Sequence, residues 1–173
     1  MDKTKPVFIT GGTGYIGSWI VKNLLEEGYT VNLTIRNKAK TEKHDHLLKI
    51  AGESPGTLNV FEADLLVEGS YAEAMAECEV VFHIASPFLI NGIKDAQRQL
   101  VDPALKGTAN VLNTVNQTDS VKRVVLTSSV VSIYGDAIDA REISDGIFTE
   151  KQWNTTSTLK HNPYSYSKVL AEK

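Results

Sequence analysis

A tyrosine and a lysine near the end of the chain are four residues apart, a spacing that would let the lysine assist proton transfer by the tyrosine. Tyr164 and Lys168 follow Asn162 and Pro163, a pair typical of a helix start with Asn162 as the cap and Pro163 in the first turn. Residues four apart share one face of a helix. The lysine ammonium and the positive end of the helix would both stabilise a phenolate, so Tyr164 could exchange a proton with an alcohol or a carbonyl oxygen.

A serine offers a second polar group for the same oxygen. Ser129 follows a basic-then-apolar run that reads as a strand, and Ser128 is the nearby alternative. Tyr166 competes with Tyr164, but it lies only two residues from Lys168 and would point elsewhere. Because the Tyr-x-x-x-Lys pattern is frequent by chance, the prediction depends on the order of a glycine turn, a strand ending in serines and a capped helix.

A glycine-rich segment near the start of the chain is expected to bind the pyrophosphate of a dinucleotide. It joins an apolar strand at residues 7–10 to an amphipathic helical pattern. Gly11 or Gly12 would permit the tight turn, and Gly14 would let the backbone approach the phosphates. Gly17 would let the helix pack closely on the strand. A glycine-rich connection in some other α/β protein is the alternative that this context disfavours.

The end of the second expected strand indicates which dinucleotide is bound. NAD-selective sites place an acidic residue there, about 20 residues past the glycines. This chain has Arg36 instead, followed by Lys38, Lys40 and Lys43. A cation suits a 2′-phosphate, so we expect NADP(H) to be preferred over NAD(H), with a solvated basic loop as the alternative. We expect no metal ion.

The elements that must position these groups alternate between strand and helix. The expected strands cover residues 7–10, 30–36, 58–63, 80–85 and 122–126. This pattern predicts an α/β fold, a Rossmann-type doubly wound parallel sheet in three αβα layers, with residues 1–173 as one dinucleotide-binding domain. His83, inside the fourth strand, is expected to be a satisfied core histidine. The polar segment 134–162 is expected to form an active-site loop.

The expected helices connect these strands. One covers about residues 40–51, and a capping box from Ser70 to Glu73 begins a short one. Pro103 would lie in the first turn or at a kink of a long helix. The apolar pattern of the first helix is Ile16, Trp19, Ile20, Leu24 and Leu25. That of the long helix is Val101, Leu105, Thr108, Leu112 and Val115.

Composition excludes several classes of protein. The chain has 42% hydrophobic and 23% charged residues, an ordinary soluble balance, and a net charge of −3 that disfavours nucleic acid as the main partner. Its one cysteine, Cys78, suits a reducing compartment. Because no apolar run approaches the ~20 residues of a membrane span and the first residues lack a signal-peptide core, we expect a cytoplasmic protein with no membrane partner.

Taken together, these motifs resemble the extended short-chain dehydrogenase/reductases, and most closely the branch of dihydroflavonol and cinnamoyl-CoA reductases. The resembling segments run from Thr10 to Trp19, Ala63 to Leu65, His83 to Phe88, Thr127 to Ser129 and Tyr164 to Lys168. They span nearly the whole chain and are specific in combination. The resemblance implies NADP(H)-dependent reduction of a carbonyl compound, which could be a ketone, an aldehyde or a flavonoid-like molecule, to an alcohol.

The resemblance also implies roles for particular residues. Ser129, Tyr164 and Lys168 would form the catalytic set, and the last two would also contact the cofactor, Lys168 at the nicotinamide ribose. Asp64 and Leu65 would hold the adenine, although an Asp at a strand end can also merely cap a turn. The remaining cofactor contacts would be Gly11, Gly14, Tyr15, Ile16 and Gly17 at the turn, Arg36 and Lys43 at the 2′-phosphate, and Ile84, Ala85 and Ser86 along the cofactor.

Other functions and assemblies stay open from the sequence. A nucleotide-sugar epimerase or dehydratase with bound NAD uses the same catalytic set, and Ser132 to Gly135 resembles a stretch common there. A non-catalytic dinucleotide-binding module is a third possibility. Because members of the resembled family continue past the Tyr-Lys helix, we expect the chain to be truncated there, without the substrate domain, either as a fragment or as a shortened protein with compromised activity. The helix from Pro103 to Val115 could also form a homodimer, as in relatives.

Overall fold

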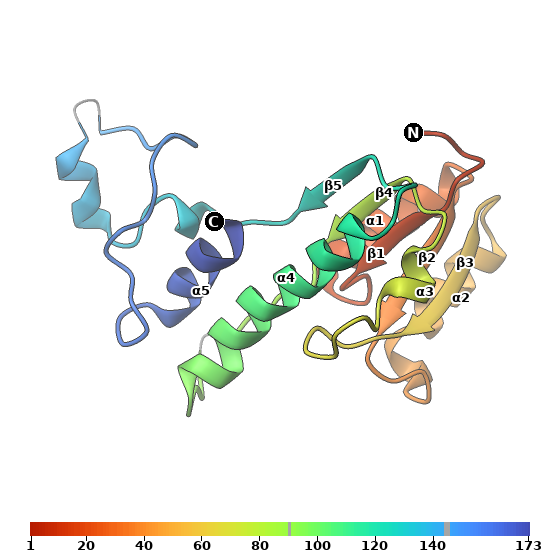
Figure 1. Ribbon diagram of the computed structural model, residues 1–173, viewed down its shortest axis with the longest axis horizontal. Helices are drawn as coiled ribbons and strands as arrows, with labels where there is room; N and C mark the ends of the chain where they lie inside the picture. The colour runs from red at the N-terminus through yellow and green to blue at the C-terminus, as the bar shows by residue number, and fades with distance from the viewer. Residues whose placement is uncertain (90, 144–145) are drawn as a thin grey trace. The chain divides into compact units, whose positions relative to one another are not determined.

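The computed structural model in Figure 1 describes residues 1–89, 91–143 and 146–173. The chain divides into two compact units, each of which is described by itself. The sheet unit consists of Met1–Ala85 and Asn110–Thr127, and the carboxyl-terminal unit consists of Ser86–Ala109 and Ser128–Lys173. The single domain expected over residues 1–173 stays a prediction.

Five parallel strands form one sheet in the order β3-β2-β1-β4-β5. The strands are β1 (Val7–Thr10), β2 (Thr30–Ile35), β3 (Thr57–Glu62), β4 (Val80–His83) and β5 (Arg123–Leu126). The expected Rossmann-type doubly wound sheet is therefore confirmed. Because β1 pairs with both β2 and β4, the strand order reverses between β1 and β4. In open α/β sheets, ligands bind outside the carboxyl ends of the strands at such a switch point.

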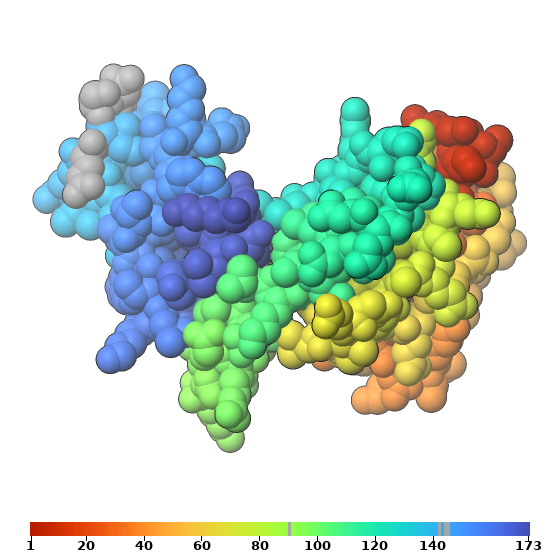
Figure 2. Space-filling view, in the orientation of Figure 1, coloured from red at the N-terminus to blue at the C-terminus, as the bar shows by residue number. Residues whose placement is uncertain are grey.

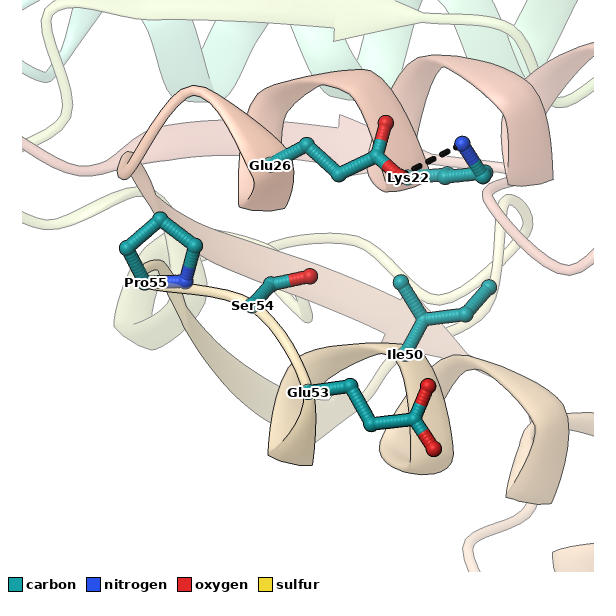
Figure 3. Close-up of a pocket in the computed structure, with 6 residues that line it drawn as sticks. All are labelled: Lys22, Glu26, Ile50, Glu53, Ser54 and Pro55. Carbon is teal, nitrogen blue, oxygen red and sulfur yellow. Dashed lines mark hydrogen bonds and ion pairs between the residues drawn. The ribbon is translucent and has the colours of Figure 1, made fainter.

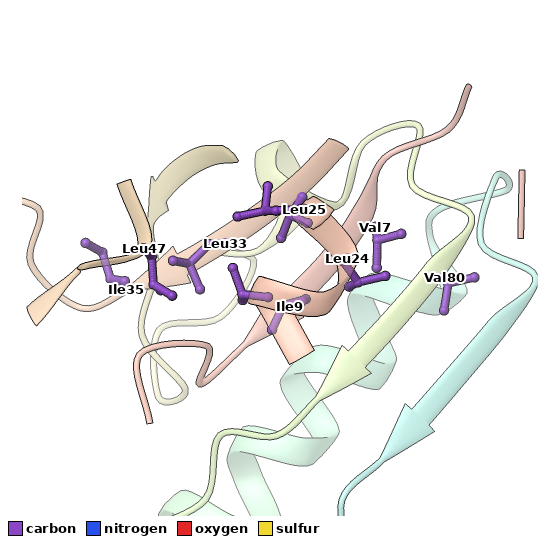
Figure 4. Packing of buried hydrophobic residues seen from close by; sticks show 10 residues of the cluster. Val7, Ile9, Leu24, Leu25, Leu33, Ile35, Leu47 and Val80 are labelled. Atoms are coloured by element: carbon purple, nitrogen blue, oxygen red, sulfur yellow. The ribbon is translucent and has the colours of Figure 1, made fainter. Parts of the chain in front are cut away.

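One face of the sheet is covered by two helices, α1 (Tyr15–Glu26) and α2 (Asp45–Gly52). Successive side chains of a strand point to opposite faces, so Val7 and Ile9 of β1 face these helices together. Figure 4 shows this packing around β1 and β2. The buried residues of this cluster are Val7, Ile9, Val21, Leu24, Leu25, Val31, Leu33, Ile35, Leu47 and Val80.

The opposite face is covered by α3 (Ala72–Met75) and by the part of α4 (Asp102–Asn116) that belongs to the sheet unit. Phe8, which alternates with Val7 and Ile9, is buried here, and its ring meets that of Tyr71 edge-on at 5.8 Å. Val81 and Val111 join the same cluster. Helices on both faces give the three αβα layers that the sequence predicts.

The apolar face expected for α1 is corrected by the structure. Gly17 and Val21 are buried with the two leucines, whereas Ile16 is 57% and Trp19 53% exposed. The helix is rotated toward its glycine because a residue without a side chain allows the backbone to approach the sheet most closely there.

The long helix needs a similar correction. Pro103 lies in the first turn of α4, which is one of the two positions expected for it. A π-helical turn, η2 (Gln97–Val101), precedes this helix. However, Leu105 is 41% and Leu112 40% exposed, while Ala104 and Thr108 are buried. Thr108 is buried as the pattern predicts, but Ala104 and Val111 are buried on this helix in place of the two leucines. Figure 2 shows the outer surface of α4, in green to teal, uncovered in that view.

Two helix starts also differ from expectation. A 3-10 turn, η1 (Thr41–Lys43), precedes α2, so this helix begins at Asp45 rather than near residue 40. The capping box expected at Ser70 is wrong, because Tyr71 is the cap of α3 and makes no side-chain capping bond. The Ser70 hydroxyl instead donates to the main-chain oxygen of Asp64, 3.0 Å away.

The described residues of the carboxyl-terminal unit form further helical elements. These are two 3-10 turns, η3 (Val130–Ser132) and η4 (Ala137–Glu142), and the last helix, α5 (Pro163–Glu172). The segment expected to form an active-site loop is tied together by side chains. Asp139 accepts hydrogen bonds from the N–H groups of Gly135 and Asp136, both at 3.0 Å, and from the Thr156 hydroxyl at 2.8 Å. The N–H of Asp136 is the main cause that lowers the pKa of Asp139.

Candidate functional site

The glycine turn lies directly after β1, at the switch point of the sheet. Gly11 has a φ of +70°, a conformation that residues with side chains rarely adopt. A Cβ there would lie 2.6 Å from the main-chain nitrogen of Ala85. Gly12 has no such backbone requirement, and a Cβ there would meet the side chains of Leu33 and Val21. Of the two glycines considered from the sequence, Gly11 is therefore the one that makes the turn.

The turn leads directly into the first amides of α1. Gly14 is the N-cap, its N–H donates to the Gly11 oxygen at 3.0 Å, and it is exposed together with Tyr15 and Ile16. The first N–H groups of a helix have no partner within the helix and carry partial positive charge. Gly17 is buried, and a Cβ there would collide with the Gly11 oxygen and lie 2.7 Å from Cα of Gly12. This geometry suits a pyrophosphate group at the start of α1.

A buried hydrogen-bond network holds the ends of β1 and β4 together. The Thr10 hydroxyl accepts hydrogen bonds from the N–H groups of Ile84 and Ala85, both at 3.1 Å. Its oxygen is also 2.7 Å from Nδ1 of His83, to which it donates its own proton since its lone pairs serve the two amides. His83 is thus the bonded core histidine that the sequence predicted. The role of Thr10 was missed, although Thr10 pairs with His83 in the strand register.

Replacing Thr10 by valine tests this network. Valine has nearly the same shape but no hydroxyl, so two amides and a histidine nitrogen would lose their partner. We expect the free energy of unfolding to fall by about 2–4 kcal/mol, because each unsatisfied buried group costs about 1–3 kcal/mol and some relaxation will occur. Unfolding in urea measures this loss of stability. Thr34→Val is the control, since the Thr34 hydroxyl makes one bond of 3.3 Å to a carbonyl. Equal losses in the two variants would contradict the network's importance.

Basic side chains follow the carboxyl end of β2. Arg36 comes directly after the strand, Lys43 lies in η1, and both are exposed. The Lys38 ammonium lies 5.8 Å from the Phe61 ring, and the main-chain N–H of Lys38 donates to a Glu62 carboxylate oxygen at 3.0 Å. Lys38 therefore has contacts of its own within the sheet unit. In the part of the chain that the structure describes, no carboxylate forms an ion pair with Arg36 or Lys43. Both cations are therefore accessible to an anionic ligand.

The segment after β3 has a structural role of its own. One carboxylate oxygen of Asp64 accepts the N–H of Leu66 at 2.9 Å, so Asp64 does cap a turn. The main-chain oxygen of Leu65 accepts the Asn110 amide at 3.2 Å. The turn places Asp64 and Leu65, both half-buried, just past the carboxyl end of β3. Contact with an adenine stays a prediction.

The residues after β4 border the glycine turn. The backbone of Ile84 and Ala85 lies against Gly11, so close that a side chain at position 11 would collide with it. Ser86 follows them, and its hydroxyl oxygen is buried with no hydrogen-bond partner among the described residues. A buried polar atom without a partner is unusual and suits a position where a ligand supplies the partner.

The expected cap of the Tyr-Lys helix is correct in position but not in mechanism. Pro163 begins α5, and Asn162 is its N-cap. However, Asn162 has a left-handed backbone (φ 55°) and makes no side-chain capping bond. Its side-chain amide donates to a carboxylate oxygen of Asp136, 3.2 Å away, and the second carboxylate oxygen lies 2.7 Å from Nε2 of His161. Asp136 therefore fixes the chain where α5 begins.

Tyr164 and Lys168 share one face of α5, as their spacing predicts. The Phe88 ring meets the Tyr164 ring edge-on at 5.2 Å. Lys168 is only 7% exposed. Burial lowers the pKa of the Lys168 ammonium, and the nearby Glu172 carboxylate opposes that shift. A buried cation one turn from a tyrosine is the arrangement that would stabilise a phenolate.

The structure distinguishes the two candidate serines. Ser129 is the N-cap of η3, and its oxygen accepts the N–H of Val131 at 3.4 Å, which leaves its own proton to donate. The Ser128 hydroxyl donates to the Glu172 carboxylate. Ser129 is thus the better candidate to hold a substrate oxygen. Because α5 packs against η3, the structure brings the segment of Ser129 next to the helix of Tyr164 and Lys168.

The described residues also form a small pocket away from these groups. Figure 3 shows it between α1 and the segment that leads into β3, lined by Lys22, Glu26, Ile50, Glu53, Ser54 and Pro55. An ion pair of 2.6 Å joins Lys22 and Glu26 at its rim. Because Pro55 precedes β3, this pocket lies toward the amino ends of the strands, opposite to the glycine turn. It is not the dinucleotide site that the sequence predicts.

The fold and the glycine turn define a nucleotide-binding α/β protein of the Rossmann type. Residues 7–173 match the NAD dependent epimerase/dehydratase family. The chain belongs to this family. Among the described residues, no helix is both long and apolar enough to cross a membrane.

Two similar proteins are reductases by name. A cinnamoyl-CoA reductase from Medicago truncatula is 43% identical over 170 residues, which cover 96% of this chain and 51% of that protein. A putative anthocyanidin reductase from Ginkgo biloba is 39% identical over 99% of this chain and 50% of that protein. The chain thus spans about half the length of these relatives. Their names confirm the predicted resemblance to the branch of cinnamoyl-CoA and dihydroflavonol reductases.

Solved structures agree with this relationship. The yeast methylglyoxal/isovaleraldehyde reductase complexed with NADPH has a TM-score of 0.80 and 30% identity, over 96% of this chain and 50% of that one. Vestitone reductase from alfalfa (Medicago sativa) has a TM-score of 0.72 and 32% identity, over 97% of this chain and 50% of that one.

Proposed function

We propose that this chain binds NADP(H) and carries the catalytic residues of a reductase that converts a carbonyl compound, a ketone, an aldehyde or a flavonoid-like molecule, to an alcohol. The observation that carries the proposal is the pair of Tyr164 and buried Lys168 on one face of α5, packed against the turn that Ser129 caps. The reductase names of the relatives support it. Because this chain spans about half the length of each relative, the reductase activity is proposed for it and is not carried over from their names.

The residues of the sheet unit fit a dinucleotide. The first amides of α1 would bind the pyrophosphate, with Gly14 and Gly17 giving the close approach. Arg36 and Lys43, exposed and without a carboxylate partner among the described residues, would hold the 2′-phosphate. Asp64 and Leu65 would hold the adenine. Ile84 and Ala85 would line the cofactor, and so would Ser86 of the carboxyl-terminal unit, whose hydroxyl has no partner among the described residues.

The residues of the carboxyl-terminal unit would handle the proton. The bound dinucleotide would supply the hydride. Tyr164 would donate its phenolic proton to the oxygen of the carbonyl, and the Ser129 hydroxyl would donate a hydrogen bond to the same oxygen. Lys168, as an ammonium, would stabilise the phenolate left behind and hold the nicotinamide ribose. Its low exposure means that its charge would act with little screening by water.

Replacing Arg36 by alanine tests the cofactor. We expect this chain to bind NADPH more tightly than NADH, and Arg36→Ala to weaken NADPH binding by roughly 10- to 100-fold, since hydrogen bonds to charged groups contribute about 1.5–3 kcal/mol. NADH binding should stay nearly unchanged, because NADH lacks the 2′-phosphate. Calorimetric titration of the 173-residue chain measures both affinities.

A matched control and two contrary outcomes complete this test. Arg123→Ala removes an exposed arginine at the amino end of β5, away from the carboxyl ends of the strands, and should leave both affinities unchanged. NAD retained through purification would instead favour the epimerase or dehydratase alternative. Binding of neither dinucleotide would refute the proposal.

The assembly of the protein stays a prediction. Leu105 and Leu112 are exposed and lie seven residues apart, so they share one side of α4. This apolar surface fits the expected homodimer contact through the helix from Pro103 to Val115.

A further inference from the structure

We propose that Glu172 is a positioning residue, which holds the Ser129-bearing turn η3 against the helix that carries Tyr164 and Lys168. The proposal deepens the proposed function and rests on it for its catalytic consequence. The contact itself is a property of this chain alone. All the residues involved belong to the carboxyl-terminal unit.

Glu172 forms hydrogen bonds with two serines near Ser129 in the sequence, Ser128 and Ser132. Its carboxylate accepts a hydrogen bond from the Ser128 hydroxyl and lies 2.5 Å from the Ser132 hydroxyl. The two hydroxyls are 3.1 Å apart. The Ser132 hydroxyl is also 2.6 Å from the main-chain oxygen of Ser129. One carboxylate oxygen therefore connects to Ser128, just before the N-cap Ser129, and to Ser132, the last residue of η3.

The carboxylate reaches this turn from the same side of α5 that presents the tyrosine and the lysine. Tyr164, Lys168 and Glu172 follow one another at intervals of four residues, so they form one stripe along the helix. A fixed Glu172 therefore fixes the rotation of that stripe relative to Ser129. A misplacement of about 1 Å between reacting groups can cost 10²-fold in rate, so such a link between the two segments matters for catalysis.

Glu172 also bears on the charge of Lys168. Burial lowers the pKa of the lysine, and the Glu172 carboxylate raises it again. The other charged groups on the elements packed against α5 have their own partners. Arg98 of η2 pairs with Asp95 at 3.5 Å, and Asp102, next along the chain, pairs with Lys106 at 3.3 Å. The residues of η3 carry no charge.

Amide hydrogen exchange on the cofactor-free 173-residue chain tests the contact directly. The N–H groups of Ser132 and Ile133 bond within η3, to the oxygens of Ser129 and Val130, and report its opening. In Glu172→Ala we expect both to exchange at least about tenfold faster, because the link to a charged acceptor is lost. Glu172→Gln, which keeps one acceptor oxygen without the charge, should give a smaller increase. Glu150→Ala, an exposed glutamate of the same unit, should change nothing.

A second substitution keeps the test independent of general unfolding. Ser128→Ala removes one partner of the carboxylate and should raise the same exchange rates, while the double variant with Glu172→Ala should exchange little faster than Glu172→Ala alone. Amides of β1 and β4 should keep their wild-type rates in every variant. Unchanged exchange of Ser132 and Ile133 in Glu172→Ala, or additive effects in the double variant, would overturn the proposal.

Carbonyl reduction provides the catalytic measurement. Glu172→Ala should lower kcat by roughly 10- to 100-fold with little change in KM, as expected for misplaced catalytic groups. Its rate should also fall at a lower pH on the alkaline side, since Lys168 without its countercharge loses its proton sooner. If exchange responds but the wild type reduces no carbonyl, the contact stands and the proposed function fails. If the wild type is active and exchange does not respond, the positioning role fails.

Discussion

Replacing Tyr164 by phenylalanine is expected to lower kcat for NADPH-dependent carbonyl reduction by roughly 10²- to 10⁴-fold, the usual contribution of a positioned acid or base. Phenylalanine keeps the ring and its edge-on contact with Phe88, so α5 should remain in place. What it lacks is the proton that the carbonyl oxygen must receive. The affinity for NADPH should change little, because only one expected cofactor contact, the Tyr164 hydroxyl, is removed, while the glycine turn and Arg36 belong to other elements. Steady-state kinetics and a binding titration separate the two effects.

The chain offers a matched control for this prediction two residues away. Tyr166→Phe removes a phenolic hydroxyl from the same helix, but from a residue that does not share the face of Lys168. It should keep the wild-type rate within a factor of about two. A Tyr164→Phe variant with the rate of wild type, or a Tyr166→Phe variant with the larger loss, would show that the proton donor has been assigned to the wrong residue.

The sequence was sufficient to predict the strands because each parallel strand is a short apolar run next to a turn signal. β1, β2, β3, β4 and β5 all lie where apolar periodicity put them, within one or two residues at their ends. Their parallel, doubly wound arrangement was predicted from the alternation of strand and helix, whereas their order in the sheet comes from the structure. Buried strands such as β1 and β4 carry a strong local signal, because both of their faces must be apolar.

The helices were predicted less well because their buried faces depend on small residues. The apolar periodicity of α1 put Ile16 and Trp19 inside, but the helix approaches the sheet at Gly17, a position that the glycine motif indicated and the apolar pattern did not. In α4, likewise, Ala104 is buried and the two larger leucines of the pattern are not, although Thr108 is buried as predicted. A pattern that weighs residues by hydrophobicity overlooks the positions where close packing requires little volume.

The candidate site shows the same limit for polar side chains. Residue types and order were enough to place the glycine turn after β1, Arg36 after β2, and Tyr164 and Lys168 on one face of α5. The partners of those residues were not predictable, since they depend on contacts distant in the sequence. Thr10 binds across to the segment after β4, and Glu172 binds the serines 40 and 44 residues before it. Asn162 has the residue type of a cap, yet its side chain turns to Asp136.

A single methyl group at Gly17 is expected to damage both the fold and the binding of the dinucleotide. In the interior of an exposed helix, glycine to alanine ordinarily stabilises by up to about 1 kcal/mol. At Gly17 the new Cβ would collide with the Gly11 oxygen and lie 2.7 Å from Cα of Gly12. Because both are backbone atoms, α1 must move away from the turn. Overpacking of this kind costs about 1–3 kcal/mol, occasionally more, so the sign of the effect is reversed.

The displacement of α1 would also move the amides that are proposed to bind the pyrophosphate. We therefore expect Gly17→Ala to lower the free energy of unfolding in urea and to weaken NADPH binding at least about tenfold. Gly52→Ala is the matched control, because Gly52 ends α2 and a Cβ there meets nothing within 4 Å. That variant should be as stable as the wild type or slightly more stable, with unchanged affinity. If the two variants behaved alike, the close approach of α1 to the turn would not be what makes glycine necessary at position 17.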